Sequence, residues 1–170
     1  MTADDPWLAD AHARFERPLL LYARRLSADP AAADDAVQET FLRLLKQPRA
    51  AIDGRLAEWL YTVCRNVVLD RGRKEHAMHT REKTIARESA RAAPNDAQAI
   101  AIAKDESSAA LRALERLPAK QQEALRLKFQ GGLSYAEIGR VMDEAAGTVG
   151  WLIHEGLKTL RARLGKQVQS

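Results

Sequence analysis

Residues 134–164, SYAEIGRVMDEAAGTVGWLIHEGLKTLRARL, decide the fold. Ser134 is followed three residues later by Glu137, which is the spacing of a capping box at the start of a helix. The apolar residues Ile138, Val141 and Met142 then fall at i, i+3 and i+4, so this helix has one apolar stripe. Gly139 would allow a second helix to approach closely. The stretch therefore predicts two helices joined by a short turn, as in a helix-turn-helix motif.

The second helix is expected after a short polar turn, residues 143–147, with Thr148 as its N-cap. Its inward-facing residues are expected to be Val149, Leu152, Ile153, Leu157, Leu160 and Leu164. The opposite face carries Trp151, His154, Lys158 and Arg161. A helix with such a polar and basic face suits the major groove of DNA. An ordinary helical hairpin is the plainer alternative.

Composition favours an all-α protein of one large domain or two small ones. The 170 residues are 46% hydrophobic but only 5% aromatic, and good helix formers dominate. Residues 1–64 carry eight basic and ten acidic side chains, residues 65–91 carry eight and four, and residues 92–170 carry eleven and nine. An acidic front suggests a protein partner, and a basic middle suggests nucleic acid.

Cysteine and histidine usage argues against redox, metal or cofactor chemistry. Cys64 is the single cysteine and is expected to be a packing residue, so no disulfide can form within the chain and a reducing cytoplasm is expected. His12, His76, His79 and His154 are scattered and suggest no zinc site. No P-loop, signal peptide or membrane-length apolar run occurs. We expect no cofactor, no metal and no enzymatic activity.

The front of the chain predicts three helices, at residues 6–26, 30–46 and 55–74, with a loop at 47–54. Pro18 should kink or divide the first helix. Asp29 and Pro30 should cap and begin the second. Trp59 is assigned to the core of the third helix rather than to base stacking. The three buried stripes are expected to be Leu8, Phe15, Leu19, Tyr22 and Leu26; Ala33, Val37, Phe41, Leu44 and Leu45; and Leu56, Trp59, Leu60, Val63 and Val67.

A tether is predicted between two domains, which are placed at residues 1–75 and 105–170 with a linker at 76–104. Its charges alternate without a sustained apolar period, and residues 93–96 form a breaker cluster, although parts of it could be helical. In the second domain one helix is marked by Leu111, Leu114 and Leu117. The next starts at Pro118, carries Gln121, Leu125 and Phe129 on one side, and ends at the glycine pair 131–132.

Four stretches in this order resemble a bacterial RNA polymerase sigma factor of the extracytoplasmic-function (ECF) group. They are residues 34–43 (DDAVQETFLR), residues 59–70 (WLYTVCRNVVLD), residues 114–118 with Gln121 and Gln122, and residues 134–164. The resemblance implies an all-α protein with a region 2-like front domain and a region 4-like back domain. It also implies that residues 34–43 bind core RNA polymerase, with Asp34, Asp35, Gln38, Glu39 and Arg43 as candidate contacts. Acidic side chains would set orientation and on-rate for a basic partner, although favourable placement near the helix start would also explain Asp34 and Asp35.

The resemblance places recognition of the −10 element, as melted strand, on the helix that contains Asn66 and Asp70. These two residues are spaced i, i+4 on one helix face. Asparagine can pair with adenine through two hydrogen bonds, and aspartate can accept a hydrogen bond from cytosine. The candidate phosphate contacts of this helix are Arg65, Arg71, Arg73 and Lys74.

Recognition of the −35 element, as duplex, is implied for the helix-turn-helix. The candidates are Lys128, Ser134, Thr148, Gly150, Trp151, His154, Lys158 and Arg161. Many family members place Lys or Arg and Ser just after the Thr-Val pair, whereas this chain has Gly150 and Trp151 there, followed by Glu155 and Gly156. Gly156 should weaken the helix by about 1 kcal/mol relative to Ala. The −35 preference is therefore expected to be unusual or weak.

The function expected from these residues is that of an alternative sigma factor, which binds core polymerase and directs promoter-specific initiation. Core RNA polymerase, promoter DNA and an anti-sigma factor or another regulator are the expected partners. The alternative is a stand-alone helix-turn-helix regulator whose front domain dimerises or senses a signal. Such a regulator would bind duplex DNA tightly without polymerase. An enzyme with a helical fold is disfavoured because no convergent catalytic set is visible.

Overall fold

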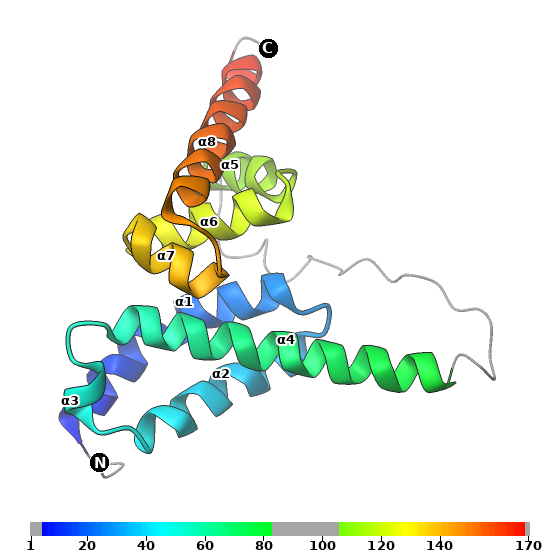
Figure 1. Ribbon diagram of the computed structural model, residues 1–170. Coiled ribbons are helices and arrows are strands. Elements are labelled where there is room, and N and C mark those ends of the chain that lie inside the picture. Colours follow the sequence, from blue (N-terminus) through cyan, green and yellow to red (C-terminus); the bar gives the residue numbers. More distant parts are fainter. Residues whose placement is uncertain (1–4, 83–105, 169–170) are drawn as a thin grey trace. The chain divides into compact units, whose positions relative to one another are not determined.

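A computed structural model of the protein describes residues 5–82 and 106–168. The chain divides into two compact units, Met1–Pro94 and Asn95–Ser170, and each is described by itself. Regular structure in the described residues is entirely α-helical, as predicted (Figure 1). The first unit contains α1 (Pro6–Leu26), α2 (Pro30–Leu45), α3 (Arg49–Ile52) and α4 (Leu56–Glu82). The second contains α5 (Glu106–Glu115), α6 (Ala119–Phe129), α7 (Tyr135–Met142) and α8 (Ala146–Val168).

The first two helices begin where local chemistry predicts. The Asp29 side chain accepts a hydrogen bond from the backbone N–H of Ala31 at 3.0 Å, and Pro30 is the first residue of α2. Of the two outcomes expected for Pro18, a kink or a division of the first helix, division does not occur, because α1 runs through it from Pro6 to Leu26. Ala11 before the proline and Leu19 directly after it are both buried, so tertiary packing on both sides of Pro18 supports the helix.

Two boundaries in the first unit differ from prediction. The expected loop 47–54 contains the one-turn helix α3, which starts after Pro48 and ends at the buried Ile52. The third predicted helix, 55–74, is α4 and continues to Glu82. No Pro or Gly interrupts residues 75–82, so nothing in that segment stops the helix. The beginning of the predicted linker is therefore helical, and its remaining part, 83–104, lies outside the described residues.

The core of the first unit lies where α1, α2 and α4 contact one another (Figure 1). The stripe predicted for α4 is wrong in part, because Leu56, Trp59 and Val63 are only half-buried. Tyr61, Cys64 and Val68 are buried instead. α4 packs against two helices at once, so its buried face is wider than one stripe and is turned toward Tyr61, whose ring meets that of Tyr22 edge-on at 5.1 Å between centroids. The other buried residues of these helices are Ala11, Leu19, Ala23, Ala33, Ala36, Val37, Thr40, Phe41, Leu44, Leu60 and Val67.

Burial keeps two acidic groups of this core protonated. It raises the pKa of the Cys64 thiol from 9.0 to about 11, although a hydrogen bond with Thr40 opposes the shift, and it raises the pKa of Tyr61 from 10.0 to about 12. As the pH rises, the unfolded chain therefore loses these two protons before the folded protein does. The stability contributed by the buried, protonated Cys64 and Tyr61 is complete below about pH 9 and is lost as the pH rises toward 11 and 12.

We expect the first unit to lose unfolding free energy between pH 9 and pH 11. Urea unfolding of the full chain, followed by circular dichroism at a series of pH values, measures this loss. A Cys64→Ala variant controls for other alkaline titrations and should lose less over the same range. Equal pH dependence in both proteins would contradict a role for the buried thiol.

In the second unit, α5, α6 and α7 each pack against α8. Gln122 joins α5 to α6, because its Nε2 donates to the backbone oxygens of Glu115 and Leu117 at 2.8 Å each. Phe129, placed by sequence on one side with the buried Leu125, is 65% exposed. The buried apolar residues are Ala113, Leu117, Ala124, Leu125, Leu127, Leu133, Ile138, Val141, Met142, Val149, Leu152 and Ile153.

Gly156 has a packing role that helix propensity alone does not reveal. A Cβ atom at this position would lie 2.8 Å from Cδ1 of the buried Leu125. The glycine thus allows α6 to approach α8 closely. Glycine weakens a helix by about 1 kcal/mol relative to alanine, and the close packing of α6 on α8 offsets this loss.

Candidate nucleic-acid interfaces

The capping box at the start of α7 forms as predicted. Ser134 Oγ accepts a hydrogen bond from the backbone N–H of Glu137 at 3.2 Å, and the N–H of Ser134 donates to Glu137 Oε2 at 2.7 Å. At the other end Asp143 adopts the left-handed conformation with φ 57°, and the N–H of Glu144 donates to the Gly139 oxygen at 2.8 Å. This closure ends α7 abruptly and reverses the chain toward α8.

The predicted start of the recognition helix is wrong by three residues. α8 begins at Ala146, and the backbone oxygen of Ala145 accepts from the N–H of Val149 at 3.0 Å. The turn therefore consists of residues 143–145, because the left-handed Asp143 reverses the chain in few residues. Thr148 is not the N-cap but lies, exposed, in the first turn of α8. There it stands beside backbone N–H groups that have no acceptor within the helix, which is a favourable place for a phosphate.

The outward face of α8 carries most of the predicted −35 contacts. Trp151 is 59% exposed, a large fraction for such an apolar side chain. Thr148, His154, Lys158 and Arg161 are exposed with it, whereas Val149, Leu152 and Ile153 are buried beneath. The predicted inward residues Leu157, Leu160 and Leu164 are half-buried. This face, Thr148, Trp151, His154, Lys158 and Arg161, is called the recognition face below.

Gly150 is placed differently from the other predicted residues, because it lies against the ring of Tyr135. A Cβ at Gly150 would be 3.5 Å from Tyr135 Cε2. Tyr135 is 42% exposed, and Lys128 Nζ lies 5.3 Å from its ring centroid in a cation–π contact. Sequence reasoning missed Tyr135, although an aromatic residue directly after an N-cap was a usable signal. Lys128, Tyr135 and Gly150 together form a corner beside the recognition face.

The predicted −10 residues of α4 separate into an exposed face and two flanks. Asn66, Asp70, Arg73 and Lys74 are all exposed, at i, i+4, i+7 and i+8, and so share one face of the helix. Arg73 Nη1 lies 3.3 Å from Asp70 Oδ1. Arg65 and Arg71 lie half-buried on the two sides of this face. The exposed set, Asn66, Asp70, Arg73 and Lys74, is called the α4 polar face below.

The acidic residues of α2 do not form the bare anionic surface that the sequence suggested. Asp34 accepts from Arg24 of α1 at 3.0 Å, and Asp35 Oδ2 lies 3.6 Å from Arg71 Nη1 of α4. Glu39 Oε1 accepts from Arg43 Nε at 2.9 Å, one turn along α2. None of the three acids is in the first turn of α2, so the helix dipole does not explain their placement. Gln38, Arg43 and Asp35 remain exposed.

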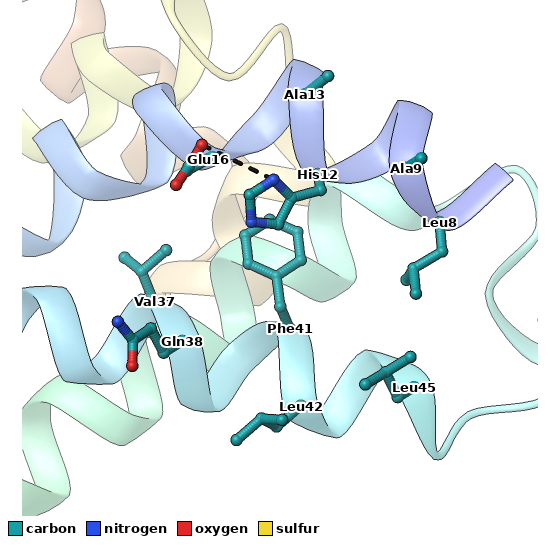
Figure 2. Close-up of a pocket in the computed structure, with 10 residues that line it drawn as sticks. All are labelled: Leu8, Ala9, His12, Ala13, Glu16, Val37, Gln38, Phe41, Leu42 and Leu45. Carbon is teal, nitrogen blue, oxygen red and sulfur yellow. Dashed lines mark ion pairs between the residues drawn. The ribbon is translucent and has the colours of Figure 1, made fainter. Parts of the chain in front are cut away.

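A groove of about 550 Å³ lies between α1 and α2 (Figure 2). Figure 2 shows the His12 ring lying over Phe41, with a centroid separation of 4.6 Å, and His12 Nδ1 lies 3.7 Å from Glu16 Oε2. Leu42 is 54% exposed at its edge and was missed, although it lies outside the apolar stripe of α2 and so signalled a contact surface. The lining residues are Leu8, Ala9, His12, Ala13, Glu16, Val37, Gln38, Phe41, Leu42 and Leu45.

The described part of the chain brings together no three His, Cys, Asp or Glu side chains that could hold a metal ion. His76, His79 and His154 are each exposed. Within the same residues, none of the helices has the length and apolar content that a membrane crossing requires.

Comparison with known proteins matches both units. Residues 12–77 match Sigma-70 region 2, and residues 107–160 match Sigma-70 region 4. The chain is 33% identical to the ECF RNA polymerase sigma factor SigL of Mycobacterium tuberculosis, covering 92% of this chain and 86% of SigL. It is 36% identical to the ECF RNA polymerase sigma factor BldN of Streptomyces coelicolor, covering 79% of this chain and 51% of BldN, so it spans about half the length of that relative. The fold is similar to that of the sigma factor RpoE of Bartonella quintana, with a TM-score of 0.63, 24% identity and coverage of 92% of this chain and 97% of RpoE.

The two units and their exposed helix faces define an all-α DNA-binding protein with a helix-turn-helix. Both matched regions are those of an initiation factor. The chain belongs to the ECF group of RNA polymerase sigma factors, the alternative sigma factors that direct transcription initiation.

Proposed function

We propose that this sigma factor binds core RNA polymerase through α2, binds the −35 element as duplex through α8, and captures the −10 element as melted strand through α4. The observation that carries the proposal is the exposure of the α4 polar face. Asn66 and Asp70 point away from a core built of Leu60, Tyr61 and Cys64, and no packing role accounts for them. Polar side chains free to face solvent at one helical spacing are suited to base edges.

The recognition face would enter the major groove with Trp151 at its centre. An exposed indole can contact the methyl group of thymine, and His154 can hydrogen-bond a base edge. Lys158, Arg161, Lys128 and the N–H groups at the start of α8 would hold phosphates. Ser134 uses its hydroxyl in the capping box, so its predicted DNA contact would come through the remaining lone pair or the donor hydrogen.

The energy for strand separation would come from capturing bases on α4 and from contacts with polymerase. Extruded bases need polar side chains for their edges and cations for the backbone, and Arg73 and Lys74 supply the cations. Asp70 already accepts from Arg73, which orients its carboxylate on the polar face. Arg65 and Arg71 would extend the cationic surface on either side. We propose that the protein itself catalyses no reaction and works in the cytoplasm.

Docking to core polymerase would combine charge with apolar contact. Gln38 and Leu42 line the α1–α2 groove, and Asp35 and Glu39 lie on the same helix as both. Asp35 is now paired with Arg71, and Glu39 with Arg43. Cations of a basic partner can replace these two arginines, because an exposed ion pair stabilises by at most about 1 kcal/mol. An anti-sigma factor is a further proposed partner, since the similar RpoE was crystallised in complex with the anti-sigma factor NepR.

The test of the whole proposal is in vitro transcription with purified core RNA polymerase. The protein should comigrate with core enzyme and start transcription from at least one genomic fragment. It should bind the same DNA weakly when core enzyme is omitted. Tight duplex binding without polymerase, combined with no transcription in its presence, would favour a stand-alone helix-turn-helix regulator instead.

Reversing the charge of the α2 acids should weaken core binding. We expect the double substitution Asp35→Lys and Glu39→Lys to raise the Kd for core polymerase at least about tenfold, because it places two cations against a basic partner. Fluorescence anisotropy of labelled protein titrated with core enzyme measures this. Asp10→Lys is the control for the change at Glu39. Asp10 forms an i, i+4 ion pair with Arg14 on α1, as Glu39 does with Arg43 on α2. If the control and the double variant bind equally well, these acids are not in the interface.

A further inference from the structure

A cationic pocket lies between α5 and α8, away from the surfaces assigned above. Its volume is about 290 Å³, and its lining consists of Ala109, Arg112, Ala113, Arg116, Arg163 and Lys166. Four of these six residues are cationic and none is acidic. All four cationic side chains are exposed, so a ligand can reach them from solvent.

Two pairs of like charges, one from each helix, contribute to the lining of this pocket. Arg112 and Arg116 are four residues apart along α5 and its C-terminal turn, and Arg163 and Lys166 are three apart on α8. Like charges at these spacings repel, and here the two pairs also face each other. Attraction to the C-terminal ends of helices explains cations in a last turn, such as Arg112 and Lys166, but not the convergence of two pairs on one pocket. A bound anion could interact with cations of both helices at once.

Arg163 is held in place at the pocket by a backbone contact. Arg163 Nη1 donates to the backbone oxygen of Ala113 at 3.4 Å, which ties its guanidinium to α5. The two small residues Ala109 and Ala113 leave the floor of the pocket open. Guanidinium groups match the oxygen pairs of phosphate groups through two parallel hydrogen bonds. The pocket is therefore suited to a compact anion with several charged oxygens.

DNA bound on the recognition face does not account for this pocket. At 100° per residue, Arg163 points about 140° away from the centre of that face, and Lys166 lies about 22 Å along the helix axis from Trp151 at 1.5 Å per residue. Arg163 also lies roughly 18 Å along the helix axis from Trp151, at 1.5 Å per residue. A peptide is disfavoured too, because the lining offers no large apolar surface to hold its side chains.

We propose that the α5–α8 pocket binds a polyphosphate group carrying three or more negative charges, as an inorganic chain or as part of a nucleotide. The test is isothermal titration of the full chain at low salt, without divalent metal, using inorganic tripolyphosphate and, separately, ATP. We expect saturable binding of one tripolyphosphate per chain. Equal affinity for ATP would show that phosphates alone are recognised, and tighter binding of ATP would show that the nucleoside contributes. Both results support the proposal.

The variant Arg112→Gln with Arg116→Gln should weaken binding about a hundredfold, since two charge-assisted contacts are lost at about tenfold each. Lys158→Gln with Arg161→Gln removes the same charge from the recognition face of α8, outside the pocket lining, and should leave binding unchanged. Circular dichroism confirms that both proteins fold. The proposal is overturned if tripolyphosphate shows no saturable binding or if both variants lose affinity equally. It is also overturned if an acidic peptide of equal charge binds more tightly through Arg112 and Arg116.

Discussion

Replacing Gly139 with alanine should destabilise the helix-turn-helix by about 2–3 kcal/mol, because the new Cβ meets backbone that cannot move aside. It would lie 2.5 Å from the Glu144 oxygen and 3.6 Å from the Ala146 nitrogen. Alanine is worth about 1 kcal/mol more than glycine in a helix, and this gain is too small to offset the clash. The turn would have to open, and α8 would shift relative to α7. Affinity for duplex promoter DNA should therefore fall together with stability.

The matched control for Gly139→Ala is Gly147→Ala, in the first turn of the partner helix. An added Cβ at Gly147 meets no atom within 4 Å, so this variant should be neutral or more stable by up to about 1 kcal/mol. Hydrogen exchange of the α7 and α8 backbone amides in the full chain measures the stability of this unit separately from that of the first unit. If the two variants exchanged at the same rate, the close approach at Gly139 would not be what fixes the turn.

Features set by a few neighbouring residues were predicted well from the sequence. The capping box of Ser134 and Glu137 and the cap at Asp29 both form as expected, because each depends on chemistry within three residues. The exposure of Asn66 and Asp70 also follows from local spacing, since both lie opposite the apolar side of α4. The order of the motifs along the chain was sufficient to identify the family.

Features that depend on packing between distant segments were missed or misplaced. The register of the buried face of α4 is set by α1 and α2 together, so Tyr61 and Cys64 displaced Trp59 and Val63 from the core. The pairing of Asp35 with Arg71 joins two helices far apart in sequence, and no local pattern announces it. Thr148 looked like a helix cap because its residue type is common there, whereas the left-handed Asp143 had already completed the turn.

The role proposed for Asn66 gives the sharpest functional prediction, since it concerns strand separation and not DNA affinity in general. A base captured by Asn66 adds its binding energy only after that base has left the duplex. On double-stranded promoter DNA this energy offsets the cost of unpairing, and it therefore accelerates opening. On a template whose −10 region is already unpaired, that cost has been removed in advance.

Asn66→Ala should therefore slow open-complex formation on duplex promoter at least about tenfold, which corresponds to losing one bidentate base contact of about 1–3 kcal/mol. On a pre-melted template the loss should be much smaller. Permanganate footprinting of open complexes formed with core polymerase on both templates measures the two rates. Asn66 is exposed, so the fold should not change, and His79→Ala, exposed on the same helix, is the control. An equal loss on both templates would show that Asn66 contributes to binding but not to strand separation.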